Sequence, residues 1–297
     1  MSEQSVRRLT NKALAEQWLR PTYFINHSTL GLQTFNVFFS CPREKHSAVI
    51  KLLRQAPQVV WVTENVGHPR YQVTAVSRSA AEIANLFDDI AQRCKAPITS
   101  RCWSIEVSLD YWGTRVLTSQ LTGEPYSLMP QDVASYDLLD LRILDMLRSQ
   151  EVLSITAMSR ALKESSTTVA YRYKRLQSRK IISPPFYRFN PQKSDAFSCE
   201  YLLSVARVEG DIHEEIVKFC DRTPEVCMLI RAFGMWDYKI EVEAQTFDRL
   251  LDARDLLEAT LPGVFTDVMT IIRKNYVSER CELAQHPDTI SSLRAPQ

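Results

Sequence analysis

Basic side chains gather in one stretch of a chain that is otherwise almost neutral. Between Ser154 and Lys193 nine residues are basic and one, Glu164, is acidic, whereas the whole chain of 297 residues has a formal net charge of +1. A local excess of about eight positive charges on a short segment is typical of proteins that bind nucleic acid. Because acids are almost absent from the segment, a charged face that is merely solvated is the weaker interpretation.

Three short helices and a pair of extended segments are expected to position these charges. Asp137 is suited to begin the first helix as its N-cap, and apolar residues recur on one face of that helix. Ser154 and Ser165 are suited to cap the second and third helices, which a tight turn joins. The pattern predicts a winged helix-turn-helix DNA-binding domain over residues 136–190.

The third helix carries the candidate DNA contacts. Small hydroxyl side chains near its N-terminus fit the major groove, and the longer side chains that follow are able to reach bases or phosphates. The arginines add affinity for phosphates without reading sequence. The predicted DNA-binding residues are Ser166, Thr167, Thr168, Tyr171, Arg172, Lys174, Arg175 and Arg179. Two alternatives stay open: the hydroxyls only cap the helix, or Arg172 pairs with Asp140 or Asp145 instead of DNA.

An α+β pattern occurs twice in the chain. Residues 21–112 and 191–280 each show the order strand, helix, strand, strand, helix, strand, which is that of a ferredoxin-like domain. The copies align without a gap at one constant offset, which matches Gly67 with Gly234. Such a register indicates duplication. The predicted fold class is α+β: two ferredoxin-like domains of the dimeric α/β-barrel type, with the winged helix-turn-helix between them.

The remaining segments connect or flank these domains. Residues 1–20 match the end of the third helix and the start of the wing at the same offset. They are predicted to be the remnant of a first helix-turn-helix, whose earlier part was lost or lies upstream of Met1. Residues 113–135 contain prolines and no regular period, which is typical of a linker. Residues 281–297 are expected to form a disordered tail.

Several classes of protein are disfavoured by the composition. Seven cysteines, none spaced as Cys-x-x-Cys, argue against a disulfide framework or a zinc site and favour the reducing cytoplasm. No apolar run is long enough to span a membrane, and there is no secretory signal. The five histidines form no ligand or catalytic pair, and glycine-rich phosphate loops are absent. We therefore expect neither an enzyme nor a cofactor.

Several motifs together resemble the leucine-responsive/asparagine-C (Lrp/AsnC) family of transcription regulators. They are Asp140-x-Arg142-Ile143-Leu144, Ser165-x-x-Thr168-Val169-x-x-Arg172-x-x-Arg175-Leu176, Gly234-x-x-Asp237-Tyr238 and Leu261-Pro262-Gly263-Val264. The resemblance covers about residues 137–277, and a degenerate copy covers about 7–110. Lys163 and Glu164 depart from it, because the family usually has a glycine and an apolar residue between the two reading helices.

The resemblance implies a regulator that binds double-stranded DNA and forms a homo-oligomer through its ferredoxin-like domains. Such regulators often respond to a small effector such as an amino acid. Gly234 and Asp237 match the family turn nearest the effector pocket, whereas Arg70 replaces the acid in the first copy. Asp237 is alternatively a turn residue without a ligand. The two ferredoxin-like domains are expected to pair, within one chain or between chains.

Two other functions stay open beside the predicted sequence-specific regulator. The sirohaem decarboxylases are similar to the same regulator fold and also consist of paired units. For such an enzyme, His68 and Arg70 are the place where the sequence suggests a porphyrin-sized pocket. The third function is a module that senses a ligand but no longer binds DNA.

Overall fold

The computed structural model of the chain describes residues 2–113, 115, 124–149, 154–190, 193, 196–206, 211–279, 282–287 and 289. Its elements follow the expected order, with two βαββαβ sets on either side of three helices. The first set is β2 (Gln33–Ser40), α2 (His46–Gln55), β3 (Val59–Asn65), β4 (Tyr71–Ser77), α3 (Ala80–Cys94) and β5 (Thr99–Tyr111). The second set is β8 (Phe197–Val205), α7 (Ile212–Arg222), β9 (Val226–Gly234), β10 (Tyr238–Ala244), α8 (Phe247–Thr260) and β11 (Phe265–Glu279).

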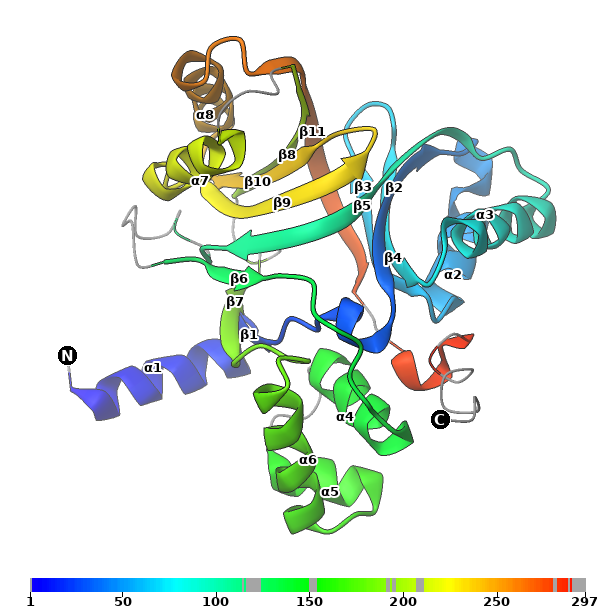
Figure 1. Ribbon diagram of the computed structural model, residues 1–297, viewed down its shortest axis with the longest axis vertical. Helices are drawn as coiled ribbons and strands as arrows, with labels where there is room; N and C mark the ends of the chain where they lie inside the picture. The colour runs from blue at the N-terminus through cyan, green and yellow to red at the C-terminus, as the bar shows by residue number, and fades with distance from the viewer. Residues whose placement is uncertain are drawn as a thin grey trace.

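Eight of these strands close into one barrel (Figure 1). Their order is β2-β4-β3-β11-β8-β10-β9-β5, and β5 returns to β2. A short strand, β6 (Tyr126–Leu128), pairs with the end of β5. Helices α2 and α3 cover the barrel on one side, and α7 and α8 cover it on another (Figure 1). Closure pairs strand edges that would otherwise be open in each set.

Alternation along the strands separates the barrel interior from the helix-covered outside. In β2, Phe35, Val37 and Phe39 belong to the core beneath α2 and α3. Asn36 lies between them and turns the other way, into the barrel, where it bonds to polar side chains of neighbouring strands. Glu200 has the same place in β8, next to Tyr201 of the second core. The barrel interior is therefore polar in its middle.

The two βαββαβ sets are not separate sheets, because strands of one set pair with strands of the other. β3 pairs with β11, and β5 pairs with β9, so that Asn65 lies opposite Arg273 and Glu106 lies opposite Ala232. These two pairings are equivalent under the repeat offset, which gives the barrel a pseudo-twofold symmetry. The pairing that was expected within or between chains is thus made within one chain.

The constant, gap-free offset is wrong for the first strand of each set. It matches Thr74 with Glu241, but the cross-strand partners of these two residues are Asn36 and Glu200, which the offset does not match with each other. The second copy has a longer connection between its first strand and its first helix than the first copy has. The sheet fixes the register of the strand, so the connecting loop absorbs the difference.

Helices α4 (Leu138–Ser149), α5 (Ile155–Leu162) and α6 (Ser166–Ser178) form a unit at one end of the barrel (Figure 1). Apolar residues of all three share one core, which includes Leu144, Met158, Val169 and Leu176. This shared core holds the basic segment in a fixed position relative to the barrel.

The caps and the turn of this unit follow local side-chain chemistry. The hydroxyls of Ser154 and Ser165 accept hydrogen bonds from the amides of Ala157 and Thr168, at 3.1 and 3.0 Å, which confirms both predicted N-caps. Between α5 and α6, Lys163 adopts a φ of +58°. A left-handed conformation costs roughly 1–2 kcal/mol in a residue other than glycine. The turn forms without the family's usual glycine.

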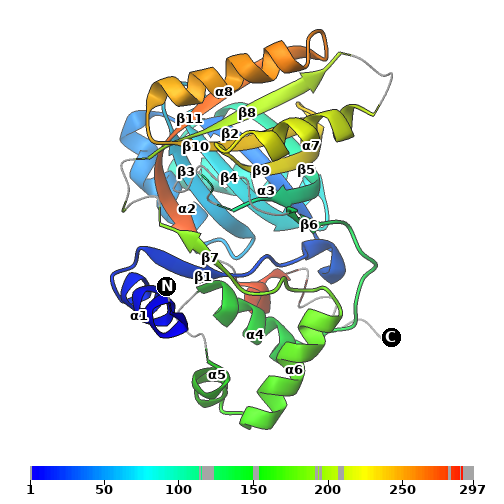
Figure 2. The same ribbon diagram turned by 90° about the vertical axis from the view of Figure 1, so that its left-hand side faces the viewer.

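A two-stranded ribbon lies between the barrel and the three helices (Figure 2). In it, β1 (Leu19–Thr22) pairs antiparallel with β7 (Phe186–Phe189), and Arg20 lies opposite Arg188. The two strands are matched by the repeat offset, so the segment predicted as a remnant pairs with the segment predicted as the wing. Helix α1 (Glu3–Ala15) leads into the ribbon and has no buried residue.

The C-terminal segment packs against α4 where the structure describes it. The amides of Leu283 and Ala284 begin the 3₁₀ turn η5 (Leu283–Gln285) and donate to the Asp145 carboxylate at 2.6 and 3.0 Å. Leu283 is fully buried. The expected disorder over 281–297 is therefore wrong for residues 282–287 and 289, because an acid on α4 satisfies the turn. The other tail residues, and residues 114 and 116–123 of the predicted linker, lie outside the described residues.

Candidate active site

The barrel encloses a cavity of about 410 Å³ that extends from its polar interior to the ribbon and α4. This volume is within the range of small-molecule sites. One wall is apolar and aromatic: the Phe24 ring stacks on that of Phe186 with centroids 4.8 Å apart and meets Tyr111 edge-on at 5.1 Å. Leu109 and Met228 continue this wall. Flat aromatic faces of this kind suit a flat apolar ligand.

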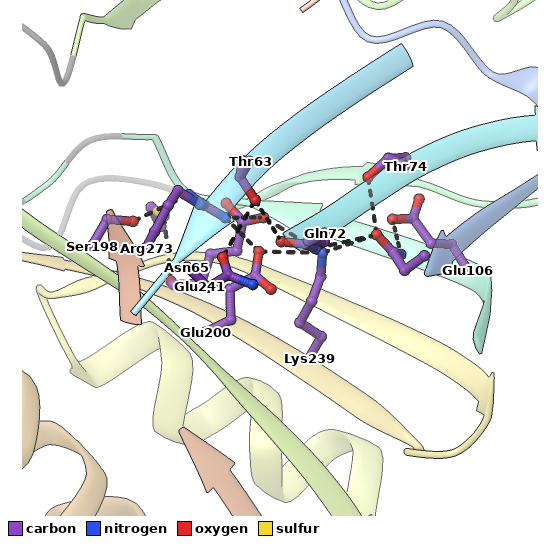
Figure 3. Close-up of polar contacts among 12 residues, drawn as sticks. Thr63, Asn65, Gln72, Thr74, Glu106, Ser198, Glu200, Lys239, Glu241 and Arg273 are labelled. Atoms are coloured by element: carbon purple, nitrogen blue, oxygen red, sulfur yellow. Dashed lines mark hydrogen bonds and ion pairs between the residues drawn. The ribbon is translucent and has the colours of Figure 1, made fainter. Parts of the chain in front are cut away.

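A second wall, from β8, β10 and β11, is charged (Figure 3). Glu200 and Arg273 form an ion pair, and Lys239 Nζ lies 3.6 Å from a carboxylate oxygen of Glu200 and of Glu241. Burial by itself raises the pKa of Glu241, but Arg273 and Lys239 outweigh burial and lower that pKa to about 2. The two cations are thus paired with the carboxyl groups of Glu200 and Glu241.

A third wall, from β2, β4 and β5, is polar and mostly uncharged (Figure 3). The fully buried Asn36 donates from Nδ2 to Glu106 Oε1 at 2.7 Å, and its Oδ1 accepts from Thr74 Oγ1 at 3.0 Å and from Lys239 Nζ at 3.5 Å. Burial raises the pKa of Glu106, although Lys239 and the Asn36 hydrogen bond oppose the shift. A carboxyl group with a raised pKa keeps its proton at a higher pH than an exposed glutamate does, which favours a role as a general acid.

His27, in the 3₁₀ turn η1 (His27–Leu30), lines the same cavity. Its Nδ1 lies 3.0 Å from Thr34 Oγ1, while its buried Nε2 has no hydrogen-bond partner within the described part of the chain. Burial lowers the pKa of His27 to about 3, and Arg148 and His286 add to the effect. The imidazole is therefore neutral at physiological pH. Glu106 and His27 have pKa values shifted in opposite directions in one cavity, which is typical of a site for proton transfer.

Arginine side chains from outside the barrel complete the cavity. Arg188 of β7 lines it, and its Cζ lies 4.6 Å from the centre of the Trp61 ring. Arg148 of α4 lines it as well. The ribbon and the helical unit therefore contribute charge to a site whose other residues come mainly from barrel strands.

The residues predicted to bind DNA divide into two groups. Three are partly buried: Thr168 contacts the cap of α6, while Arg172 lies 2.6 Å from Asp137 and, like Arg175, binds the fully buried Asp140. The alternative that Arg172 pairs with Asp140 is thus confirmed, and its contact with DNA stays a prediction. The exposed group comprises Ser166, Thr167, Tyr171, Lys174 and Arg179. None of the eight lines the cavity.

The predicted effector residues also lie away from the cavity. The carboxylate of Asp237 accepts a hydrogen bond from the amide of Val205 at 2.8 Å. Gly234 has a φ of +147° and lies so close to β5 that a Cβ atom there would be 2.6 Å from the Trp103 carbonyl oxygen. Both residues stabilise the β9–β10 turn through these contacts. Their binding of an effector stays a prediction.

His68 and Arg70, which the sequence suggested as the place for a porphyrin, bind neighbouring side chains instead. The ring nitrogens of His68 lie 2.9 and 2.6 Å from the hydroxyls of Ser40 and Ser100. Arg70 forms an ion pair with Glu64 at 2.9 Å. Neither His68 nor Arg70 lines the cavity.

Sequence reasoning did not find the cavity residues, because they are far apart in the chain and form no local motif. A weak signal exists: single polar residues interrupt strands that are otherwise apolar, as Asn36 does in β2 and Glu200 in β8. Among the described residues, no group of three or more histidine, cysteine or acidic side chains is arranged to hold a metal ion. None of the helices in the described ranges combines the length and apolar character that crossing a bilayer requires.

No model of a known family matches the chain, and no curated protein matches its sequence. Among solved structures, the sirohaem decarboxylase NirDL is similar over 99% of this chain and 91% of its own, with 11% identity and a TM-score of 0.62. NirDL in co-complex with an iron-uroporphyrin III analogue gives 10% identity, a TM-score of 0.59, and coverage of 99% and 90%. AsnC of E. coli is similar over 48% of this chain and 95% of its own, with 19% identity and a TM-score of 0.40.

These similarities correct the sequence-based expectations. Similarity to a solved enzyme extends over 99% of the chain. The prediction that the chain is not an enzyme is contradicted by this whole-chain match. That prediction relied on the absence of catalytic motifs within single segments of the sequence. The cavity is instead lined by residues from many strands. The chain has a mixed α/β fold with an eight-stranded barrel, similar over its whole length to that of the sirohaem decarboxylase NirDL.

Proposed function

We propose that the chain is a decarboxylase that acts in the barrel cavity on a tetrapyrrole bearing carboxylate side chains. The observation that carries the proposal is the presence of Glu106 and His27 in one cavity, with pKa values shifted in opposite directions. The whole-chain similarity to NirDL, which has been solved with an iron-uroporphyrin III analogue, supports the choice of reaction and substrate class.

The walls of the cavity suit such a substrate in different ways. The rings of Phe24 and Phe186 offer a flat apolar face to a macrocycle. Arg148 and Arg188 supply positive charge for carboxylates where the ribbon and α4 meet the cavity. The two cations deeper in the barrel are already bound by glutamates. The cavity therefore offers a flat apolar face to a macrocycle and positive charge to its carboxylates.

Decarboxylation replaces a carboxylate by a hydrogen atom. The bond between the carboxylate carbon and the neighbouring carbon breaks, its electron pair stays on the neighbouring carbon, and carbon dioxide leaves. A proton must then reach this carbon, and neutral Glu106 is the proposed donor. His27 lines the same cavity with an uncharged ring, so it adds no positive charge beside the substrate.

The test is anaerobic incubation with sirohaem and, separately, with iron-uroporphyrin III. Binding is followed by the visible absorbance of the ligand, and reaction by the mass lost as carbon dioxide. Glu106→Gln should bind the substrate and lose at least about 100-fold in turnover, as expected for removal of a general acid. Turnover of the native chain should fall as pH rises through the pKa of Glu106, because only the protonated form donates.

The matched control is Glu243→Gln. Glu243 is also buried with a raised pKa, because burial outweighs the opposing effect of Arg188 and Arg273, but it does not line the cavity. Its substitution should leave turnover within about twofold of the native value, because Glu243 does not line the cavity and cannot donate a proton to a substrate there. Absence of any absorbance change with either ligand, or equal turnover of the two variants, would overturn the proposal.

A second candidate function is sequence-specific binding of double-stranded DNA by α4–α6 as a winged helix-turn-helix. The observation that favours it is the exposed face of α6, where Tyr171 is 64% exposed and Lys174 is also exposed. Hydroxyls and cations without acids on one helix face suit a major groove. A homo-oligomer would present two such helices to two half-sites, and a small effector such as an amino acid is a further part of this candidate.

Footprinting on the DNA upstream of the gene tests this candidate, with and without a panel of amino acids. Tyr171→Ala should change the preferred sequence as well as the affinity, because a long side chain at this place reaches base edges. A footprint that is absent at both low and moderate salt would remove the candidate, since phosphate contacts give a steep dependence on salt.

A further inference from the structure

We infer that Lys239 and Asn36 are positioning residues that hold the proton of Glu106 on Oε2, the carboxyl oxygen left open to the cavity. The inference rests on the proposed role of Glu106 as a proton donor. It connects the charged wall to the uncharged wall, because Lys239 belongs to β10 and Asn36 to β2.

Lys239 fixes which way the Asn36 amide points. An ammonium group is a donor only, so it requires the carbonyl oxygen of Asn36 and not the amide nitrogen. Lys239 Nζ lies 3.5 Å from Asn36 Oδ1, and Thr74 Oγ1 and Gln72 Nε2 donate to the same oxygen at 3.0 and 3.5 Å. A flipped amide would set its N–H groups against the ammonium group. Glu200 and Glu241 in turn hold Lys239 in place.

The orientation of Asn36 then decides which oxygen of Glu106 carries the proton. Asn36 Nδ2 donates to Glu106 Oε1 at 2.7 Å, so this oxygen must stay an acceptor. The carbonyl oxygen of a neutral carboxyl group is a stronger acceptor than its hydroxyl oxygen, so this hydrogen bond favours the proton on Oε2. Oε2 has no hydrogen bond in the ranges that the structure describes, and Glu106 lines the cavity. The neutral carboxyl therefore presents its O–H group to the substrate.

The test is Asn36→Asp, which keeps the shape of the side chain and its acceptor oxygen for Lys239 but removes the N–H group. Glu106 then gains an anionic neighbour and donates its proton to that neighbour instead of to the cavity. We expect the pH at which turnover is half lost to rise by at least about one unit while turnover itself falls at least about tenfold. A purely structural role would lower turnover without moving this pH.

Thr74→Val is the matched control, because it removes a hydrogen bond to the same Asn36 oxygen and leaves Lys239 to orient the amide. It should not move the pH dependence. An unchanged pH dependence in Asn36→Asp, or an equal change in Thr74→Val, would overturn the inference.

A measurement on the native chain covers the case in which Asn36→Asp does not fold. The side-chain amide protons of Asn36 should shift in NMR spectra as Glu106 titrates, with the same midpoint as the Glu106 carboxyl carbon. Amide protons that do not follow this midpoint would refute the inference. The measurement needs no substrate, so a chain that shows this coupling but decarboxylates nothing would contradict the proposed function alone.

Discussion

The two halves of the barrel have equivalent strands and very different interiors. At equivalent interior positions the first half has neutral groups and one acid, and the second half has two acids and two cations. The four pairs are Asn36 and Glu200, Gln72 and Lys239, Thr74 and Glu241, and Glu106 and Arg273. In the second half the charges neutralise one another, whereas in the first half Glu106 has no cation of its own half beside it.

This difference shows what duplication within one chain permits. A homodimeric barrel would present every interior residue twice, so a buried ion cluster and a proton donor could not be assigned to different halves. Here the acids and cations of the second half pair with one another, and Lys239 also contacts Asn36 of the first half. Glu106 of the first half forms no ion pair within the described residues. Substitutions at equivalent positions of the two copies should therefore have different consequences.

Arg273→Met should destabilise the fold far more than Glu106→Gln at the equivalent position. Arg273 is bound to Glu200 and lies 3.5 Å from Glu241, and its removal leaves buried carboxylates without their main partner. Breaking a buried ion pair in this way costs about 3–5 kcal/mol. Glu106→Gln should cost less than about 1 kcal/mol, because an amide keeps an acceptor for Asn36. Urea unfolding of both variants measures the difference, and equal losses would remove the distinction between the halves.

Gly234→Ala should destabilise more than Gly67→Ala, although the two glycines are equivalent. Both have positive φ, +147° and +86°. At Gly234 a Cβ atom would lie 2.6 Å from the Trp103 carbonyl oxygen, whereas at Gly67 nothing lies within 4 Å. We expect losses of roughly 2–4 and about 1 kcal/mol, from backbone strain alone at Gly67 and from strain plus overlap at Gly234. Thermal unfolding monitored by circular dichroism compares them. Similar losses would show that the β9–β10 turn moves away from β5.

Acid should weaken the first half through His27. Burial lowers the pKa of His27 from 6.5 to about 3, so the folded chain favours the neutral ring. The stabilisation is complete above pH 6.5 and is lost as pH falls toward 3, by at most about 1.4 kcal/mol per pH unit. His27→Asn, which retains a polar atom for Thr34, should show a smaller loss of unfolding free energy between pH 6.5 and 4. Parallel pH profiles of the native chain and the variant would mean that His27 does not titrate as expected.

Lys174→Ala should affect DNA binding, if α6 binds DNA, and Arg7→Ala at the equivalent place in α1 should not. Loss of one phosphate contact is expected to lower affinity about equally for all sequences and to reduce the salt slope by about one. Gel shifts at several salt concentrations measure both quantities. An equal effect of the two substitutions would indicate that basic charge in general, and not the face of α6, attracts the nucleic acid.

The local elements of this fold could be predicted because their signals are local. Ser79, Ser154 and Ser165 cap helices as their residue type suggests. The strands of the two βαββαβ sets lie within the predicted ranges 21–112 and 191–280. The register of the first strands could not be predicted. The constant offset of the repeat matches Asn36 with Leu203, which lies in the core beneath α7 and α8. The true match is Glu200, since an odd shift of register exchanges the inner and outer faces of a strand.

The candidate site was harder to predict than the fold, because its chemistry depends on burial and on partners. Glu106 has no distinctive neighbours in the sequence, and only its place beside Asn36 and Lys239 makes it a candidate proton donor. His27 is one of five histidines, and only its place in the cavity wall and the burial that lowers its pKa distinguish it. The basic residues of α6 were easier to notice, although Arg172 and Arg175 bind acids of the same helical unit.

Three features could be predicted from the sequence alone: the order of the strands and helices, the internal repeat, and the concentration of basic charge before the second copy. Each depends on residues that are close in the chain or on a regular repeat. The closure of the two copies into one barrel, and the cavity within it, are visible only in the tertiary structure. Asn36 meets Glu106 across 70 residues and Lys239 across 203. Contacts over such separations are made by strand pairing and closure, which also remove water and thereby set the charge state of the groups inside.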